Sequence, residues 1–356
     1  MTSSLLRMSE LIANLKGLFI LSSLHPMIVH VKRQAASRLD SSASRSWVIL
    51  KRNRALGDRE VLWLGRNDQK TMAICHIPRS KPALLHYQHH EEVCDRLWNN
   101  TALGKWRDVL PRELYRGFYK SRFYALETPL AGISASRFIQ NDEWRKNVLN
   151  ASIDAILHLH QQTSRVVIFD RRLFDKWVVQ PLQAIRQSTL PLYYPHSLTT
   201  LSKIEKHLSG QLLGIPFTLC WIHGDYWTEN ILVTPDGAQV TGIVDWELSQ
   251  PDGFPLLDLV NLLLSVNRIL EAKELGHLLI DVLEFGAWPS GWDAILGQVY
   301  QKLGNNFPDM QDILLLFWLQ HTSAKILTTS HWLVNPLWAR ANYVDVVKYL
   351  ETRFGS

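Results

Sequence analysis

The stretch that decides the fold of this chain is His223-Gly224-Asp225-Tyr226-Trp227-Thr228-Glu229-Asn230, followed by Ile243-Val244-Asp245-Trp246-Glu247. Its pattern is H-G-D-x-x-x-x-N and then, after a short interval, D-W-E. Asp225 and Asn230 are close enough in sequence for one loop to present both a carboxylate and an amide oxygen. A second carboxylate, that of Asp245, ends the next β-rich run. The stretch therefore predicts a polar site built from a loop and a strand end.

A short hairpin is predicted between the two parts of this stretch. Ile231–Val233 and Val240–Val244 are β-rich runs, and Pro235-Asp236-Gly237 between them is a strong turn signal. Folding back at this turn would place Asn230 and Asp245 at the same end of the two strands.

The side chains of this stretch suit phosphoryl transfer from a nucleotide. That reaction needs a carboxylate to receive the proton of the acceptor hydroxyl, and metal ligands to neutralise charge on the triphosphate. Asp225 can supply the carboxylate. Asn230 and Asp245 can supply the ligands, because Mg²⁺ prefers oxygen and often takes few protein groups besides phosphates and water. Order, spacing and hairpin together favour a kinase-type active site over an ordinary loop and strand end.

The segment from Cys220 to about Leu264 resembles the aminoglycoside phosphotransferase and choline kinase-like superfamily, whose members are small-molecule relatives of protein kinases. The matching motifs are the H-G-D-x-x-x-x-N loop at His223–Asn230, the D-W-E metal strand at Ile243–Glu247 and the P-x-x-D-L segment at Pro255–Leu259. The resemblance is strongest in this part of the chain and weaker in the residues that precede it.

The resemblance implies a role for each matching residue. Asp225 would be the catalytic base, and Asn230 and Asp245 would be the Mg²⁺ ligands. Asp258, which opens the next helix, would brace the catalytic loop through hydrogen bonds. His223 would position the loop rather than exchange protons, as a structural histidine does.

The composition along the chain predicts three segments. Residues 1–46 are expected to form an N-terminal extension, with a helix and a polar stretch. Residues 47–128 are β-rich and contain one helix, at about Lys81 to Trp98, as a nucleotide-binding N-lobe would, and strands are expected at Trp47–Leu50, Val61–Leu64, Met72–Ile77 and Arg122–Glu127. Residues 129–356 are mostly helical and would carry the catalytic loop, the metal site and the acceptor pocket. Helices are expected there at about Asn141–Gln162, Leu256–Leu264 and Asp312–Thr328. The expected fold class is α+β, a two-lobed protein-kinase-like fold with a small β-rich N-lobe and a larger, mainly helical C-lobe.

The N-lobe matches the resembled family less well than the catalytic loop does. A hinge is expected at Leu126–Thr128, where backbone groups would bind the adenine of ATP beside Glu127. Kinases also carry a lysine on the third strand that grips the phosphates. Here His76, or else Cys75, stands at that place. A neutral imidazole replaces an ammonium only in part, although a neighbouring phosphate raises its protonated fraction.

Several alternatives to this assignment remain open in the sequence. The basic residues near enough to replace the lysine are Arg79, Lys70 and Lys81. The glutamate that pairs with the lysine in kinases could be Glu91 or Glu92, or both could be ordinary solvent-facing helix acids. No glycine-rich phosphate loop precedes the strand.

The composition favours a cytoplasmic protein. The chain has 356 residues, 46% of them hydrophobic, which is enough to bury a sizeable core. The cysteines Cys75, Cys94 and Cys220 form no C-x-x-C motif, which favours a reducing compartment and argues against a disulfide framework or a structural zinc site. We recognise no signal peptide, and no run reaches the roughly 18 charge-free apolar residues of a spanning helix. We expect no membrane partner.

Charge is unevenly distributed along the chain. Residues 1–130 carry a net charge of +10 and the remainder −5, which makes the total +5. A basic first part could attract a nucleotide polyphosphate. It could also bind nucleic acid, but no nucleic-acid module accompanies it, so we expect no such partner. No pattern indicates an oligomeric state.

The sequence predicts an ATP- and Mg²⁺-dependent phosphotransferase that acts on a hydroxyl of a small molecule. Glu247, the tryptophans of the second part and its acidic balance make a sugar, an amino sugar or an amino alcohol conceivable as the acceptor. The alternative is a nucleotide-binding pseudokinase with a regulatory or scaffolding role, because His76 replaces the lysine. The intact Asp225, Asn230 and Asp245 favour the enzyme. A protein kinase is disfavoured because H-R-D, D-F-G and A-P-E are missing.

Overall fold

The computed structural model describes residues 26–37, 48–55, 58–65, 71–285, 292–304, 306–328 and 335–354. The chain forms two compact units. The first contains the residues up to Leu84 together with Arg112–Pro129, and the second contains Leu85–Pro111 and the chain from Leu130 onward. The predicted roles of the segments 1–46, 47–128 and 129–356 stay predictions, and most of the segment 1–46 lies outside the described residues.

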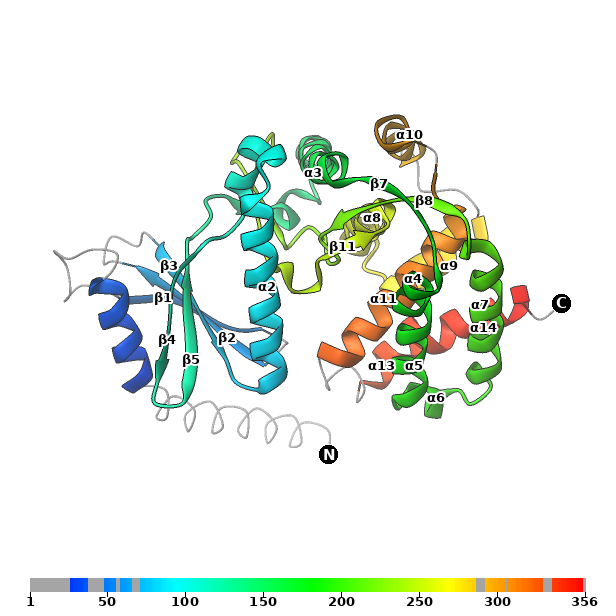
Figure 1. Cartoon of the computed structure of the whole chain (residues 1–356), viewed down its shortest axis with the longest axis horizontal. Helices are drawn as coiled ribbons and strands as arrows, with labels where there is room; N and C mark the ends of the chain where they lie inside the picture. The colour runs from blue at the N-terminus through cyan, green and yellow to red at the C-terminus, as the bar shows by residue number, and fades with distance from the viewer. Residues whose placement is uncertain are drawn as a thin grey trace. The chain divides into compact units, whose positions relative to one another are not determined.

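The first unit contains an antiparallel sheet of five strands, in the order β1-β2-β3-β5-β4 (Figure 1). The strands are β1 Val48–Ala55, β2 Arg59–Gly65, β3 Thr71–Pro78, β4 Glu113–Tyr119 and β5 Arg122–Glu127. The runs predicted as strands at Val61–Leu64, Met72–Ile77 and Arg122–Glu127 lie in β2, β3 and β5. Strand β4 was not predicted.

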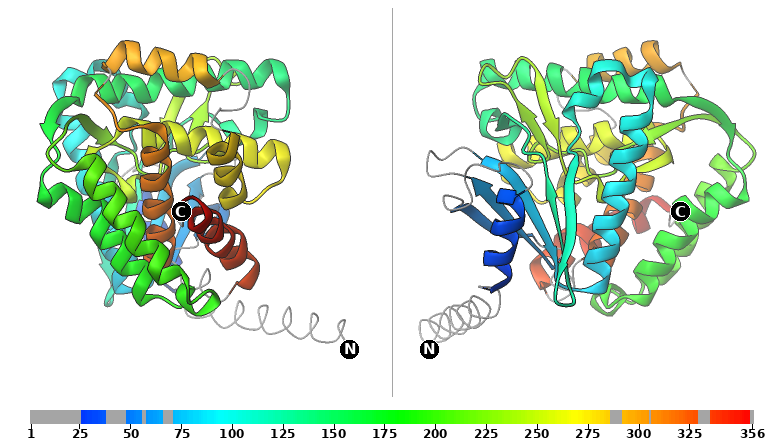
Figure 2. Two further views of the ribbon diagram at one scale, coloured as in Figure 1. Left: turned by 90° about the vertical axis from the view of Figure 1, so that its right-hand side faces the viewer. Right: turned by 60° about the vertical axis from the view of Figure 1, so that its left-hand side comes forward.

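A helix at residues 26–37 packs on this sheet. Its buried side chains are Met27, Val31, Ala35 and Ala36, which share one face because they recur about every four residues. They meet the buried side chains of β2, β3 and β5, and Figure 2 shows the dark blue helix lying against the blue strands. This helix falls within the predicted extension, yet its apolar face belongs to the core of the first unit.

The second unit is mainly helical. Its α-helices are α2 Lys81–Asn99 (which begins in the first unit), α3 Asp142–Thr163, α4 Arg171–Phe174, α5 Gln180–Gln187, α6 Leu190–Tyr193, α7 Ser197–Leu212, α8 Pro255–Glu271, α9 Leu275–Phe285, α10 Trp292–Leu303, α11 Met310–Thr328, α13 Pro336–Ala339 and α14 Asp345–Phe354. The shorter 3₁₀ and π turns are η1 Thr101–Val109, η2 Ala135–Phe138, η3 Asp175–Val179, η4 Trp246–Leu248 and η5 Arg340–Val344.

Two small antiparallel sheets complete the second unit. One has the order β10-β9-β6 and the other the order β11-β8-β7. The strands are β6 Ile133–Ser134, β7 Arg165–Ile168, β8 Pro216–Ile222, β9 Ile231–Val233, β10 Val240–Ile243 and β11 Gln250–Gly253. Strand β8 is buried along most of its length, and the chain that follows it is the H-G-D stretch.

Helix α8 is the centre of this unit (Figure 1). Its residues from Pro255 to Asn267 are all buried, and it packs against α3, α9, α11 and β8. A helix that is apolar on every side is stable only when protein surrounds it. Pro255 at the first helical position suits the missing backbone N–H there and fixes the start of the helix. Asp258 is thereby set in the first turn.

The two units confirm the predicted α+β fold class, with a small β-rich part and a larger, mainly helical part. The helices predicted at Lys81–Trp98, Asn141–Gln162, Leu256–Leu264 and Asp312–Thr328 correspond to α2, α3, α8 and α11. None of the helices in the described ranges is long and apolar enough to cross a membrane. The three cysteines form no disulfide with one another, and all are buried.

Candidate active site

The H-G-D loop is held in place by one buried carboxylate, that of Asp258. The backbone N–H groups of His223 and Gly224 donate to the two oxygens of Asp258, each at 2.8 Å. The Asp258 side chain is fully buried. Hydrogen bonds to a charged acceptor contribute about 1.5–3 kcal/mol each, and a buried carboxylate needs them. Asp258 therefore fixes the loop to the first turn of α8.

A buried histidine completes this support. His160, near the end of α3, donates from Nε2 to Asp258 Oδ2 at 3.0 Å, and both side chains are completely buried. The bond joins α3, α8 and the loop at one carboxylate. The local signal was the Leu157-His158-Leu159-His160 run, but its partner is nearly a hundred positions away, so no spacing rule could find the pair.

His223 is a structural histidine in this geometry. Its Nε2–H donates to the carbonyl of Val244 at 2.9 Å, and its Nδ1 accepts from the backbone N–H of Asp225 at 3.2 Å. Burial lowers the pKa of His223, although nearby carboxylates act in the opposite direction. With one nitrogen donating and the other accepting, the ring is neutral and ties the loop to the end of β10.

Two amide groups orient the carboxylate of Asp225. Asn261 Nδ2 lies 3.3 Å from Asp225 Oδ1, and Asn230 Nδ2 lies 3.4 Å from Asp225 Oδ2. Asn230 Nδ2 also donates to the backbone carbonyl of Asp225 at 3.0 Å. Each carboxylate oxygen therefore has one neutral donor beside it. Asn261, on α8, was not recognised in the sequence because no motif residue stands there.

The predicted hairpin is present, and it brings Asn230 and Asp245 to the same end. Strands β9 and β10 pair antiparallel, with Ile231 opposite Ile243. The N–H of Val244 donates to the carbonyl of Asn230 at 3.0 Å, directly before Asp245. The turn closes through a 2.8 Å bond from Gly237 N–H to the carbonyl of Thr234.

The donor set at this end suits Mg²⁺. The amide nitrogen of Asn230 is held by Asp225, so its oxygen is the atom that can face a cation. The Asp245 carboxylate supplies a second oxygen, and two protein ligands suffice because Mg²⁺ keeps several waters or substrate oxygens. In the parts of the chain that the structure describes, no three His, Cys, Asp or Glu side chains cluster as a denser metal site would require.

Two residues of the site have left-handed backbone conformations. Gly224 has φ +81°, and a Cβ there would lie 2.2 Å from the carbonyl oxygen of Leu248. Only glycine fits that place. Asp245 has φ 62° and ψ 58°, a conformation that aspartate tolerates better than most residues because its short side chain bonds locally. The carboxylate of Asp245 is thereby set at the bend between β10 and η4.

The histidines of α2 hold the D-W-E segment in place. His90 Nδ1 accepts from the backbone N–H of Trp246 at 3.1 Å, and His89 Nε2 donates to the carbonyl of Ser249 at 2.9 Å. On the same helix Glu91 is buried, whereas Glu92 is exposed and pairs with Arg96 one turn later. Of the two glutamates, Glu92 is therefore the surface acid and Glu91 is not.

In the first unit, two residues expected to bind the cofactor contact each other. His76 Nε2 lies 3.0 Å from Glu127 Oε2, and both side chains are almost completely buried. The backbone N–H of Thr128, in the expected hinge, donates to the carbonyl of Arg112 at 2.9 Å. The glutamate beside His76 in this unit therefore comes from β5, and the cofactor-binding roles of His76, Glu91 and Glu127 stay predictions.

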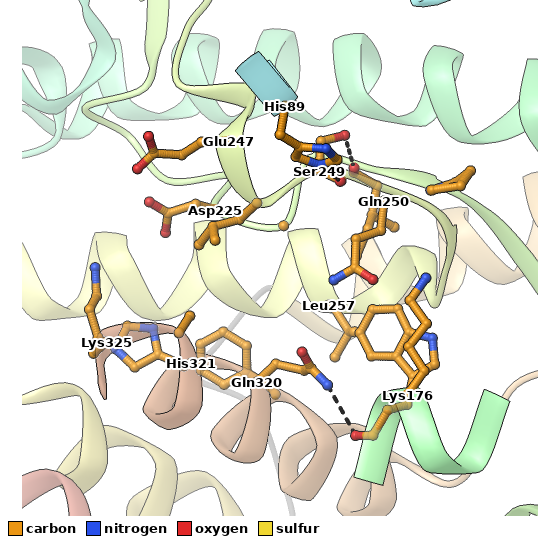
Figure 3. Close-up of a pocket in the computed structure, with 17 residues that line it drawn as sticks. His89, Lys176, Asp225, Glu247, Ser249, Gln250, Leu257, Gln320, His321 and Lys325 are labelled. Carbon is orange, nitrogen blue, oxygen red and sulfur yellow. Dashed lines mark hydrogen bonds between the residues drawn. The ribbon is translucent and has the colours of Figure 1, made fainter. Parts of the chain in front are cut away.

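A cavity of about 330 Å³ lies beside Asp225 in the second unit (Figure 3). Asp225 and Glu247 lie along one side of it, and Gln320, His321 and Lys325 of α11 along the opposite side. Figure 3 shows a further wall formed by Lys176 of η3. This volume is within the range of small-molecule sites, about 300–1,000 Å³.

The wall opposite Asp225 is polar without being acidic. Burial lowers the pKa of His321 to about 3, and the positive charges of Lys325 and Arg268 add to this effect, so the ring is neutral. Gln320 donates from Nε2 to the carbonyl of Trp177 at 3.0 Å. None of these residues could be recognised from the sequence, because η3 and α11 carry no motif and are brought together only by the fold.

Half of the tryptophans that the structure describes in the second unit are buried in its core. Trp246, Trp318, Trp338 and Trp292 are buried, and Trp177 is buried where it meets the cavity. Trp227 is half-buried, and Trp288 and Trp332 lie outside the described residues.

Comparison with known proteins gives one family match. The model of a family described as "Phosphotransferase enzyme family" matches residues 58–295, which is more than half of the chain. No curated protein matches the sequence.

Solved structures with a similar backbone are distant in sequence. An aminoglycoside phosphotransferase from Streptomyces rimosus, in complex with ADP and streptomycin, has 14% identity and a TM-score of 0.48, over 85% of this chain and 98% of that one. An aminoglycoside-3'-phosphotransferase of type VIII has 16% identity and a TM-score of 0.49, over 81% and 98%. A putative fructosamine-3-kinase from Haemophilus somnus has 11% identity and a TM-score of 0.48, over 89% and 95%.

Proposed function

Since the chain belongs to the phosphotransferase enzyme family, we propose that it transfers the γ-phosphate of ATP to a hydroxyl of a small molecule, with Mg²⁺ as the metal. One observation carries the proposal. The carboxylate of Asp225 faces a cavity in the second unit, and the loop that bears it is fixed through two backbone N–H groups by Asp258. A base that is held in place beside a ligand-sized space is what transfer to an acceptor needs.

Asp225 is the proposed catalytic base. The acceptor oxygen forms a bond to the γ-phosphorus as the bond from that phosphorus to the bridging oxygen breaks, so ADP leaves. The hydroxyl proton passes to Asp225. The amides of Asn230 and Asn261 keep the two carboxylate oxygens oriented for that proton. His223 takes no part in proton transfer because both ring nitrogens are bonded to the backbone.

Asn230 and Asp245 are the proposed ligands of Mg²⁺. The metal, when bound with the nucleotide, neutralises negative charge on the phosphates. The residues of this chain contribute by placing two oxygen donors at one hairpin end, and the backbone bond between Asn230 and Val244 keeps that end closed.

The first unit is proposed to bind nucleotide. His76, with Glu127 beside it, would replace the usual lysine on the third strand. Glu91, on α2, keeps its own predicted cofactor-binding role. The buried cysteines and the use of ATP fit a cytoplasmic location. A nucleotide-binding pseudokinase is the second candidate, since His76 is engaged by Glu127 rather than being an ammonium group aimed at phosphate.

The test is a pooled library of sugars, amino alcohols, nucleosides and aminoglycosides, incubated with the full chain and Mg·ATP and read by mass spectrometry. A phosphoryl mass gain is expected on one compound class. Asp225→Asn keeps the shape of the base and removes its proton affinity, so turnover should fall by several orders of magnitude while ATP binding persists. Asp245→Ala should weaken Mg·ATP binding itself.

Three outcomes discriminate between the candidates. Mass gain that both variants abolish supports the enzyme. Mg·ATP binding by calorimetry with no mass gain on any compound favours the pseudokinase. Turnover that both substitutions leave unchanged would overturn the assignment of the site.

A further inference from the structure

The cavity beside Asp225 holds charged side chains of both signs. Asp225 and Glu247 provide carboxylates on one side, next to the proposed metal ligands. Lys325 of α11 lies on the wall opposite them, and Lys176 of η3 lies at the other end of the cavity (Figure 3). The side with Asp225 is the reacting end, so Lys176 faces the part of the acceptor that does not react.

Lys176 is held in place and is not neutralised by a carboxylate. Within the described ranges it forms no ion pair, and the acid that acts on it, Asp252, is already paired with Arg165. Its ammonium lies over the ring of Trp177, 5.5 Å from the centroid. The Trp177 indole N–H donates to the carbonyl of Asp252 at 2.9 Å, and this hydrogen bond fixes the ring that the Lys176 ammonium contacts.

The surroundings of Lys176 favour the binding of a negatively charged ligand group to its ammonium. Burial lowers the pKa of the Lys176 ammonium, and the charge of Arg172 acts in the same direction, against Asp252. A half-buried cation without a partner gains most from a ligand that brings a negative charge. His321, which also lines the cavity, is neutral. Its ring can donate a hydrogen bond to one hydroxyl group and accept one from another without adding charge.

We propose that the acceptor carries, besides its reacting hydroxyl, an anionic group that Lys176 binds, either a carboxylate or a phosphate monoester. This inference rests on the proposed function and names its substrate class. A hydroxy acid, a sugar acid or a sugar phosphate has the required chemistry. A polycationic amino sugar does not, because its ammonium groups would face Lys176 and Lys325. The inference therefore selects against the amino sugars and amino alcohols that the sequence left open.

Binding is the first measurement, since it does not depend on turnover. The full chain carrying Asp225→Asn is titrated by calorimetry, in the presence of Mg·ADP, with four matched compounds: glucose, glucosamine, glucuronate and glucose 6-phosphate. The same series is run with glycerol, glycerate and glycerol 3-phosphate. We expect the anionic members of at least one series to bind at least tenfold more tightly than the neutral member. The carboxylate and phosphate arms show which anion is preferred.

Three further variants test whether Lys176 is the source of the preference for anionic compounds. Lys176→Gln should remove the tenfold preference and leave the affinity for the neutral compound unchanged, whereas Lys176→Arg should retain the preference. Lys146→Gln removes the same charge at an exposed position on α3 and should change nothing, which controls for net charge. Melting temperatures of all three variants verify folding, and Lys176→Arg keeps the test valid if Lys176→Gln does not fold.

Either of two results would overturn the inference: cationic or neutral members that bind as tightly as the anionic ones, or a preference that Lys176→Gln does not alter. Failure of the proposed function looks different. Charge-selective binding that is lost in Lys176→Gln, with no phosphoryl transfer to any bound compound by the unsubstituted chain, would count against the phosphotransferase and leave the anion site standing.

Discussion

Asp258 shows how much one side chain decides at the residue scale. Its carboxylate accepts from the N–H groups of His223 and Gly224 and from the ring of His160. Three elements of the chain, α3, α8 and the loop after β8, therefore meet at two oxygen atoms. A residue with this role contacts no substrate, yet it sets the backbone that carries Asp225.

Gly224 is the residue at which a minimal substitution should be most informative. Gly224→Ala places a Cβ against the carbonyl of Leu248 and forces alanine into a left-handed conformation. We expect the free energy of unfolding to fall by about 1–3 kcal/mol. Displacement of the adjoining Asp225 should lower turnover by about a hundredfold. Chemical denaturation and initial rates measure the two effects.

The matched control is Gly210→Ala, on α7, where an added Cβ meets no atom within 4 Å. Alanine in an exposed helix is more favourable than glycine by about 0.5–1 kcal/mol, so this variant should be slightly stabilised and fully active. Equal turnover of the two alanine variants would contradict the argument that the loop needs glycine at position 224.

At the scale of elements, the helix at residues 26–37 is a structural part of the first unit. Val31 is fully buried between this helix and the sheet. Its apolar partners include Leu62 and Leu64 of β2 and Tyr124 of β5. The helix at residues 26–37 therefore contributes to the same hydrophobic core as strand β3, which carries His76.

Val31→Asp tests that role, because it would bury a carboxylate that has no cation prepared for it. We expect a loss of several kcal/mol in the free energy of unfolding, measured by urea denaturation followed by circular dichroism. Arg33→Asp introduces the same residue on the exposed face of the same helix and should cost far less. Similar losses for both variants would show that the helix is not packed as the structure has it.

At the scale of the whole molecule, a half-buried neutral histidine links stability to pH. The pKa of His321 in the folded chain is about 3, against 6.5 for an unperturbed histidine. Between these values the unfolded chain binds the proton more readily than the folded one does. The free energy of unfolding therefore falls as the pH drops from about 6.5 towards 3. The stabilisation from the neutral ring is complete only above pH 6.5.

His321→Gln should make that dependence shallower, because glutamine does not titrate. The measurement is urea denaturation at several pH values from 6.5 downward, compared with the unsubstituted chain. His158→Gln, which replaces a half-buried histidine bonded to the carbonyl of Leu103, serves as the control. A slope that His321→Gln leaves unchanged would show that this ring is not the source of the pH dependence.

The parts of this molecule that the sequence determined are those that depend on neighbours in the chain. Pro235-Asp236-Gly237 directs the hairpin, and the hairpin brings Asn230 and Asp245 together, because a tight turn leaves the two strands only one way to pair. The helices α2, α3, α8 and α11 were predicted from local sequence, with α8 recognised by its continuous apolar run. Strand β4 was not predicted, because its residues are alternately half-buried and exposed and its sequence has no continuous apolar run.

Contacts between distant segments could not be read from local patterns and follow from the packing of the folded chain. His160 meets Asp258 and His76 meets Glu127, yet no local pattern pairs these residues. The cavity is assembled from η3, α8, α11 and the loops after β8 and β10, and its carboxylates and lysines come to share one space only once these elements pack. Local propensity and turn chemistry determine where the helices and strands form. Burial and electrostatic interactions between residues far apart in the sequence determine which side chains share a site.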